Sequence, residues 1–108
     1  MPVEIALCTK LLELNLGNNQ LQELPWSIGR LTRLCLLNLC DNRIQELPIS
    51  LGYCISLSKI GSGILIDRNN INDQEILHKA KIGTDHLQLL LENRLKGKLQ
   101  NNKMILSN

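Results

Sequence analysis

The hydrophobic residues between positions 11 and 56 recur at a constant interval. This interval is the number of residues that separates Leu11 from Leu34. When residues 11–33 are moved along the chain by this interval, their apolar positions fall on those of residues 34–56. The matched pairs include Leu11 with Leu34, Leu14 with Leu37, Leu16 with Leu39, Asn19 with Asn42, and Pro25 with Pro48. A fixed period of about 20–50 residues is typical of proteins in which each repeat stacks on its neighbours. The pattern therefore predicts two complete repeats, 11–33 and 34–56.

Each repeat is predicted to begin with a short strand. Over residues 12–16, leucine alternates with Glu13 and Asn15, which is the period-two pattern of a half-buried strand. The Gly-Asn-Asn sequence that follows predicts a turn. We expect the amide of Asn19 to be buried and to satisfy backbone groups that the bend leaves unpaired, because each unsatisfied buried group costs about 1–3 kcal/mol. The equivalent positions predict a structural ladder of Asn19, Asn42 and Asn69.

The pattern is incomplete on both sides of these repeats. Residues 1–10 match only the second half of a repeat, and the open strand edge expected there offers a route to self-association. Residues 57–71 form a third, irregular repeat, because Ile64–Ile71 reproduces the pattern of Leu14–Leu21 with four additional residues inserted before it. An alternative interpretation is that the chain is a truncated or fragmentary structural end of a longer repeat protein, without independent activity.

Residues 72–99 predict two helices that cap the repeats. The first is expected over residues 73–81, with Asn72 three residues before a glutamate as in a capping box. The second is expected over residues 85–99, with Thr84 as its N-cap. Its apolar face consists of Leu87, Leu90, Leu91, Leu95 and Leu99. Residues 100–108 are expected to form a flexible tail.

The composition favours some classes of partner over others. The chain has 108 residues, 2% aromatic residues and no Phe, so we expect one domain with an aliphatic core. The net charge of +2 and the single Trp and single Tyr give no support for nucleic-acid binding by base stacking. Contact of the basic cap helix with lipid or RNA is kept as a further alternative. No run of about 20 apolar residues predicts a membrane span. The first ten residues lack the pattern of a signal peptide, so we expect the four cysteines to be free and the protein to be cytoplasmic, with the nucleus as the alternative.

No residue pattern indicates catalysis. His78 and His86 lack the spacing to cysteine that metal sites show, so no metal or cofactor is expected. No nucleophile motif is present, and we do not expect an enzyme. Cys8 and Cys54 occupy the core position of Leu31 and are interpreted as small hydrophobic residues. Trp26 is interpreted as a cover for the adjacent repeat, with a binding anchor as the alternative.

The pattern LxxLxLxxNxLxxLPxxIGxL resembles the leucine-rich repeat family. Its form in this chain, with Leu-Pro and Ile-Gly, is similar to the typical intracellular class, which includes Ras-suppressor-like and Scribble-like proteins. The resemblance covers residues 11–56 in full, and residues 1–10 and 57–71 in part. It implies an α/β fold: a short solenoid with a curved parallel sheet and a C-terminal helical cap. It also implies a non-catalytic protein–protein interaction module, such as a cytoplasmic signalling scaffold, whose partner is a small GTPase or its regulator.

In this family the concave face of the sheet usually binds proteins. Carried over position by position, the resemblance implies that this face includes Glu13, Asn15, Asn18, Leu36, Asn38, Asp41, Leu65, Asp67 and Arg68. Polar recognition is expected around a small apolar centre formed by Leu36 and Leu65.

Overall fold

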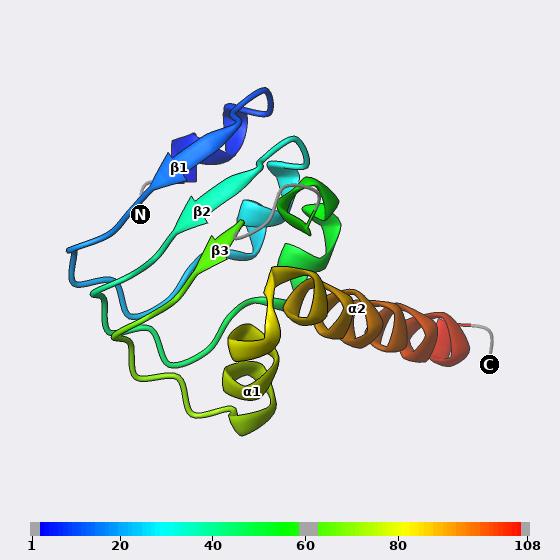
Figure 1. Cartoon of the computed structure of the whole chain (residues 1–108). Coiled ribbons are helices and arrows are strands. Elements are labelled where there is room, and N and C mark those ends of the chain that lie inside the picture. Colours follow the sequence, from blue (N-terminus) through cyan, green and yellow to red (C-terminus); the bar gives the residue numbers. More distant parts are fainter. Residues whose placement is uncertain (1–2, 59–62, 107–108) are drawn as a thin grey trace.

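The computed structural model describes residues 3–58 and 63–106 of the chain. Within them the fold is mixed α/β, with a three-stranded parallel sheet and two α-helices (Figure 1). The strands are β1 (Glu13–Asn15), β2 (Leu36–Asn38) and β3 (Ile64–Leu65), in the order β1-β2-β3. Four short 3-10 helices follow or precede them: η1 (Val3–Leu7), η2 (Trp26–Arg30), η3 (Ile49–Tyr53) and η4 (Ile55–Ser58). The α-helices are α1 (Gln74–Ile82) and α2 (Thr84–Leu106).

The register of the sheet reproduces the intervals found in the sequence. Glu13 pairs with Leu36, which is the same interval as that between the two complete repeats. Leu37 pairs with Ile64, and the interval between these two residues is longer than that between Glu13 and Leu36 by the four inserted residues. The insertion before β3 is therefore confirmed, and residues 59–62, where part of it falls, lie outside the described residues.

The 3-10 helices recur with the same period as the first two strands. The helices η1, η2 and η3 begin at Val3, Trp26 and Ile49, which are equivalent positions of successive repeats. One backbone hydrogen bond recurs at each, from Cys8 to Ile5, from Leu31 to Ile28, and from Cys54 to Leu51, with N···O distances of 3.0, 3.1 and 3.0 Å. Residues 3–10 thus adopt the same local backbone as the second half of each full repeat.

A proline precedes two of these helices. Pro25 before η2 and Pro48 before η3 are extended, with φ of −70° and −66°, because the proline ring fixes this angle. The Leu-Pro element of the sequence pattern therefore marks the point where each of these 3-10 helices begins.

Two asparagine side chains join successive turns of the chain. The first is Asn42, which is buried and accepts the N–H of Leu21 through Oδ1 at 3.1 Å. Its Nδ2 donates to the carbonyl oxygens of Leu16 at 2.9 Å and Leu39 at 3.0 Å. Asn42 is therefore hydrogen-bonded both to its own turn and to the turn before it.

Asn69 repeats this arrangement between the second and third turns. Its Oδ1 accepts from Ile44 N–H at 3.0 Å, and its Nδ2 donates to the carbonyls of Leu39 at 2.8 Å and Ile66 at 3.0 Å. Asn19 differs, since it is exposed and its Nδ2 donates only within its own turn. The prediction that Asn19 is buried is therefore wrong, because no described segment stacks against its outer side.

The core lies between the inner face of the sheet and the 3-10 helices. Leu14, Leu37 and Ile64 fill it from the three strands, and the core is entirely aliphatic apart from Cys54. The successive turns approach closely at Gly29, where an added Cβ would lie 2.6 Å from the backbone oxygen of Ser50. Only glycine fits there without displacing η3.

Helix α2 packs against η3 and η4. At Gly52 an added Cβ would lie 3.0 Å from the Cα of Glu92 and 3.0 Å from the carbonyl oxygen of Leu91. The buried Gln88 donates through Nε2 to the carbonyl of Leu51 at 2.9 Å. Helix α2 is therefore packed directly against the backbone of η3.

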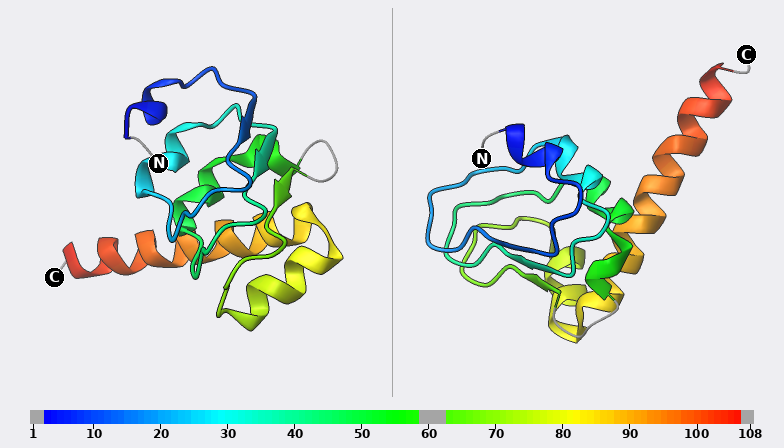
Figure 2. Two further views of the ribbon diagram at one scale, coloured as in Figure 1. Left: turned by 90° about the vertical axis from the view of Figure 1, so that its left-hand side faces the viewer. Right: turned by 90° about the horizontal axis from the view of Figure 1, so that it is seen from above.

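The last turns of α2 project beyond the rest of the chain, as Figure 2 shows. Residues 100–106 of the expected flexible tail continue α2 as helix, and residues 107–108 lie outside the described residues. Leu99 is exposed, and it does not belong to the buried face on which the sequence pattern placed it.

Helix α1 is held at its start by an ion-pair cluster. Its N-cap is Asp73, not Asn72 as expected, and the Asp73 carboxylate accepts from the N–H groups of Glu75 and Ile76. Arg94 of α2 donates to Asp73 and to Glu75, at 2.7 Å in both cases. The hydrogen bond from Arg94 lowers the pKa of Asp73 below its usual value.

Thr84 has a different role from the one expected. It is the first residue of α2, and its hydroxyl oxygen accepts from Ile64 N–H at 3.3 Å. The side chain thus joins the start of α2 to β3, a partner that the capping interpretation missed.

We predict that Asn42→Ala lowers the free energy of unfolding by about 2–4 kcal/mol, because it leaves several backbone groups of two turns without partners. The matched variant Asn19→Ala removes the equivalent side chain from an exposed turn, and its effect should stay within about 0.5 kcal/mol. Urea denaturation of both variants measures the difference. Equal losses would contradict the bridging role of Asn42.

Candidate functional site

The outer face of the sheet gathers the residues predicted to bind a partner. Alternation along the strands turns Leu14 and Leu37 into the core and their neighbours to the other side. We call this outer surface the sheet face, and define it by Glu13, Asn15, Asn18, Leu36, Asn38, Asp41, Leu65, Asp67 and Arg68. All nine are exposed or half-buried, so all are accessible to a partner.

The asparagines at the centre of the sheet face are oriented by the backbone. Asn15 pairs with Asn38 in the sheet register, and Asn38 with Leu65. The Oδ1 of Asn15 accepts from Gly17 N–H at 3.0 Å, and the Oδ1 of Asn38 accepts from Cys40 N–H at 2.9 Å. Their Nδ2 groups donate no hydrogen bond to the described residues, which leaves these donors for a partner. The side chains are thus fixed before any partner arrives.

The two leucines of the expected apolar centre lie on neighbouring strands. Leu36 pairs with Glu13 in the register, whereas Leu65 pairs with Asn38. The two leucines are therefore diagonal neighbours with a polar side chain beside each. Both are half-buried, so each presents part of its apolar side chain on the sheet face.

The turn that ends each strand contains a left-handed residue. Asn18, Asp41 and Arg68 have φ angles of 58°, 59° and 57°. Asn and Asp tolerate this conformation better than most residues, so the sequence contained a signal at the first two positions. Arg68 has no such local preference, and its conformation follows from its place in the third turn.

An ion pair joins the second and third of these turns. The Nη2 of Arg68 donates to Oδ2 of Asp41 at 2.9 Å, and its Nε donates to Oδ1 of the same carboxylate. This bidentate hydrogen bonding is the main cause that lowers the pKa of Asp41. Sequence reasoning treated the two residues as independent contacts and missed their pairing.

The remaining charges of the sheet face are acidic. Glu13 and Asp67 make no ion pair with the described residues. Because Asp41 and Arg68 neutralise each other, these two carboxylates give the sheet face an excess of negative charge.

The cysteines and Trp26 lie outside the sheet face or at its border. Burial raises the pKa of the Cys54 thiol to about 11, which keeps it protonated at neutral pH. Cys8 is exposed, so its interpretation as a core residue is wrong. Trp26 is 49% exposed, and the Nζ of Lys98 lies 4.9 Å from its ring centroid in a cation–π contact between η2 and α2.

No group of three or more His, Cys, Asp or Glu among the described residues is arranged to hold a metal ion. Within the described ranges, no helix is long and apolar enough to cross a membrane. In comparisons with known proteins, no family model and no curated protein matches this chain. Function is therefore inferred from the geometry of the sheet face and its surroundings.

We predict that Arg68→Ala raises the pKa of Asp41 toward its ordinary value of 3.8. Because the folded-state pKa of Asp41 is lowered, the stabilisation from the ion pair is fully present above the unfolded-state pKa and is lost as the pH falls through the folded-state value. An NMR titration of the side-chain carboxyl carbon of Asp41 measures the shift in both proteins. Titration of Asp41 at the same pH in both would contradict the pairing.

Proposed function

We propose that this chain is a short leucine-rich repeat solenoid that acts as a non-catalytic protein-interaction module. The repeat interpretation is supported by the recurrence of strands, 3-10 helices and bridging asparagines at the intervals described above. It is also supported by the two equivalent close approaches, Gly29 against η3 and Gly52 against α2. The packing of α2 against Gly52 supports the proposal that α2 is the C-terminal helical cap.

We propose the sheet face as the binding surface. The observation that carries this proposal is that three neighbouring strands and their turns present accessible polar side chains on one side, and that several are held in place beforehand. Asn15 and Asn38 are fixed by backbone N–H groups, and Arg68 is fixed by Asp41. Fixed side chains lose little conformational entropy on binding, which favours affinity.

The charge of the sheet face indicates the chemistry of its partner. Since Asp41 and Arg68 neutralise each other, the carboxylates of Glu13 and Asp67 dominate. A folded protein with basic and amide-rich side chains at its surface would be complementary. By resemblance to the intracellular leucine-rich repeat class, we propose a small GTPase or its regulator, bound in a cytoplasmic signalling scaffold.

We predict that the double variant Glu13→Arg with Asn38→Arg abolishes binding to such a partner. The control is Glu23→Arg with Gln45→Arg, which makes the same charge change at exposed residues in the segments that follow the turns. Biolayer interferometry against a panel of small GTPases, loaded with GDP or a GTP analogue, should show binding to the wild type and the control only. Circular dichroism checks that both variants fold. Equal binding by both variants would refute the use of the sheet face.

Self-association through β1 is a second candidate function. Among the described residues no strand pairs with the outer edge of β1. Leu16 and Leu21 are half-buried, whereas their equivalents Leu39 and Ile44 are 0% exposed. We propose that a second copy covers this edge by antiparallel pairing of β1 with β1, centred on Leu14, so that Glu13 faces Asn15 of the second copy and like charges stay apart.

We predict that Glu13→Pro makes the chain monomeric, because proline removes an outward-facing N–H from the pairing edge. Glu13→Gln retains this donor and should dimerise like the wild type. Sedimentation velocity over a range of protein concentrations measures both. A wild type that stays monomeric, or a proline variant that still dimerises, would exclude this interface.

A further inference from the structure

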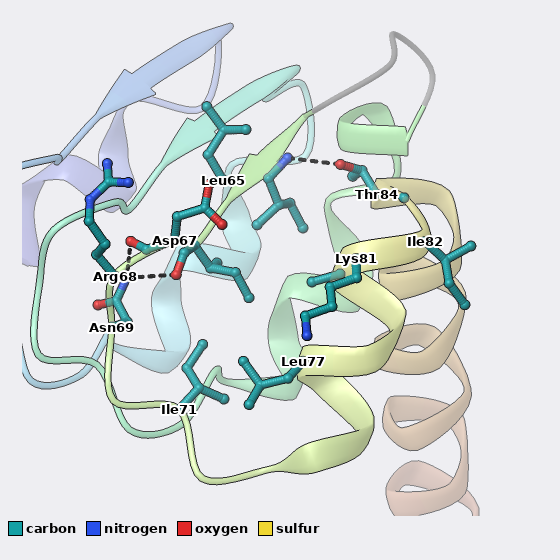
Figure 3. A pocket seen from close by; sticks show the side chains of 13 residues that line it. Leu65, Asp67, Arg68, Asn69, Ile71, Leu77, Lys81, Ile82 and Thr84 are labelled. Atoms are coloured by element: carbon teal, nitrogen blue, oxygen red, sulfur yellow. Dashed lines mark hydrogen bonds between the residues drawn. The ribbon is translucent and has the colours of Figure 1, made fainter.

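A groove lies between the free edge of β3 and helix α1. Its volume is about 390 Å³, within the range of about 300–1,000 Å³ of ligand-binding clefts. Its apolar floor is formed by Ile66 and Ile71, with Leu77 and Ala80 half-buried on the α1 side. Figure 3 shows the side chain of Leu77 projecting from α1 toward Ile71, with Lys81 on the same side of α1. We call this cavity the β3–α1 groove.

The strand side of the β3–α1 groove presents backbone donors. The carbonyl oxygens of Gly63, Leu65 and Asp67 accept hydrogen bonds from β2 and the turn that follows it, at 2.6, 2.8 and 3.0 Å. In a parallel strand, the backbone groups of alternate residues bond to opposite sides. The residues that alternate with Gly63, Leu65 and Asp67 therefore direct their N–H groups away from β2, toward α1. These residues are Ile64, Ile66 and Arg68.

One of these three donors already has an acceptor from within the chain. The hydroxyl oxygen of Thr84 accepts from Ile64 N–H at 3.3 Å (Figure 3). The N–H groups of Ile66 and Arg68 make no hydrogen bond to any described residue. In the preceding turn, the equivalent donors of Leu39 and Asp41 bond to carbonyls of a parallel neighbour. The two open donors are thus spaced for alternate carbonyl oxygens of an extended chain parallel to β3.

The charges around the β3–α1 groove are asymmetric. Lys81 is exposed on the α1 side and makes no salt bridge with the described residues. Asp67 lies on the strand side, and the guanidinium of Arg68 is occupied by Asp41. An occupant with a carboxylate would be attracted to the α1 side and repelled from the strand side.

We propose that the β3–α1 groove binds an extended peptide segment of another protein, which adds to β3 as a parallel strand. The peptide accepts hydrogen bonds from Ile66 and Arg68 N–H, places an apolar side chain on the floor beside Leu77, and places an acidic side chain at Lys81. A whole further turn from a second copy does not fit, because α2 occupies the space beyond η3. The β3–α1 groove shares Leu65, Asp67 and Arg68 with the sheet face, whereas Glu13 and Asn38 lie outside the groove. The proposal does not depend on the proposed function.

The first test uses a blocked peptide with the sequence of residues 12–16, which supplies leucines, a glutamate and a strand-forming pattern. On titration into the chain labelled with ¹⁵N, the amide protons of Ile66 and Arg68 should move downfield and become protected from exchange. Ile64 N–H, which is already bonded to Thr84, should change little. The double variant Glu13→Arg with Asn38→Arg should bind the peptide as the wild type does, which separates this site from the sheet face.

Charge reversal then tests the role of Lys81. Lys81→Glu should weaken binding of the acidic peptide about tenfold, and a peptide with lysine in place of the glutamate should recover it. Lys79→Glu makes the same charge change on α1 outside the β3–α1 groove and should stay within about twofold of the wild type. Lys81 is exposed and Lys79 is half-buried, and melting curves check that both variants fold.

Three outcomes would overturn the proposal. If acetate displaces the peptide as well as an acidic peptide does, the site binds a simple carboxylate. If the Ile66 and Arg68 signals shift with protein concentration in the absence of peptide, a second copy is the occupant. If neither this peptide nor any member of a randomised library of blocked octapeptides moves these two signals, the β3–α1 groove does not bind peptides.

Discussion

The hydrogen bonds of Asn42 and Asn69 are the constraint on which the stacking of the chain depends. After each strand the chain turns sharply, and the turn leaves backbone groups that no sheet partner can reach. One amide side chain supplies both the acceptor and the donors that these groups require. Because each amide bonds across to the turn before it, the same side chain also sets the distance between turns, and the aliphatic core forms within that spacing.

The regular spacing has consequences for both proposed surfaces. It places Asp41 and Arg68 close enough to form an ion pair. The two charges neutralise each other, and the remaining charges of the sheet face are acidic. The spacing also places β3 at the end of the sheet, where Thr84 satisfies only the first of three outward N–H groups. The sheet face and the β3–α1 groove are therefore two products of one stacking arrangement, one lying across the strands and the other at their last edge.

The periodic features were predictable from the sequence, because they follow from local patterns. The alternation around Leu14 predicted β1, and the intervals to Leu37 and Ile64 predicted the register of all three strands. The two C-terminal helices were predicted within a few residues at their starts.

In contrast, features that depend on neighbours in space were missed. Asn42 and Asn19 occupy the same place in the repeat, but the burial of an asparagine requires a turn on its outer side. Asn42 has such a turn, and no described segment provides one for Asn19. The hydroxyl of Thr84 bonds to β3, because the fold brings a strand edge within its reach. The function expected from the resemblance stays a proposal.

Hydrogen exchange of the folded chain tests this account most directly. Leu21 and Ile44 N–H are bonded to bridging asparagines, whereas Ile66 and Arg68 N–H face the β3–α1 groove without an acceptor among the described residues. We predict that the amides of Leu21 and Ile44 exchange slowly and those of Ile66 and Arg68 exchange fast. Fast exchange at Leu21 and Ile44, or protection of Ile66 and Arg68 in the isolated monomer, would contradict it.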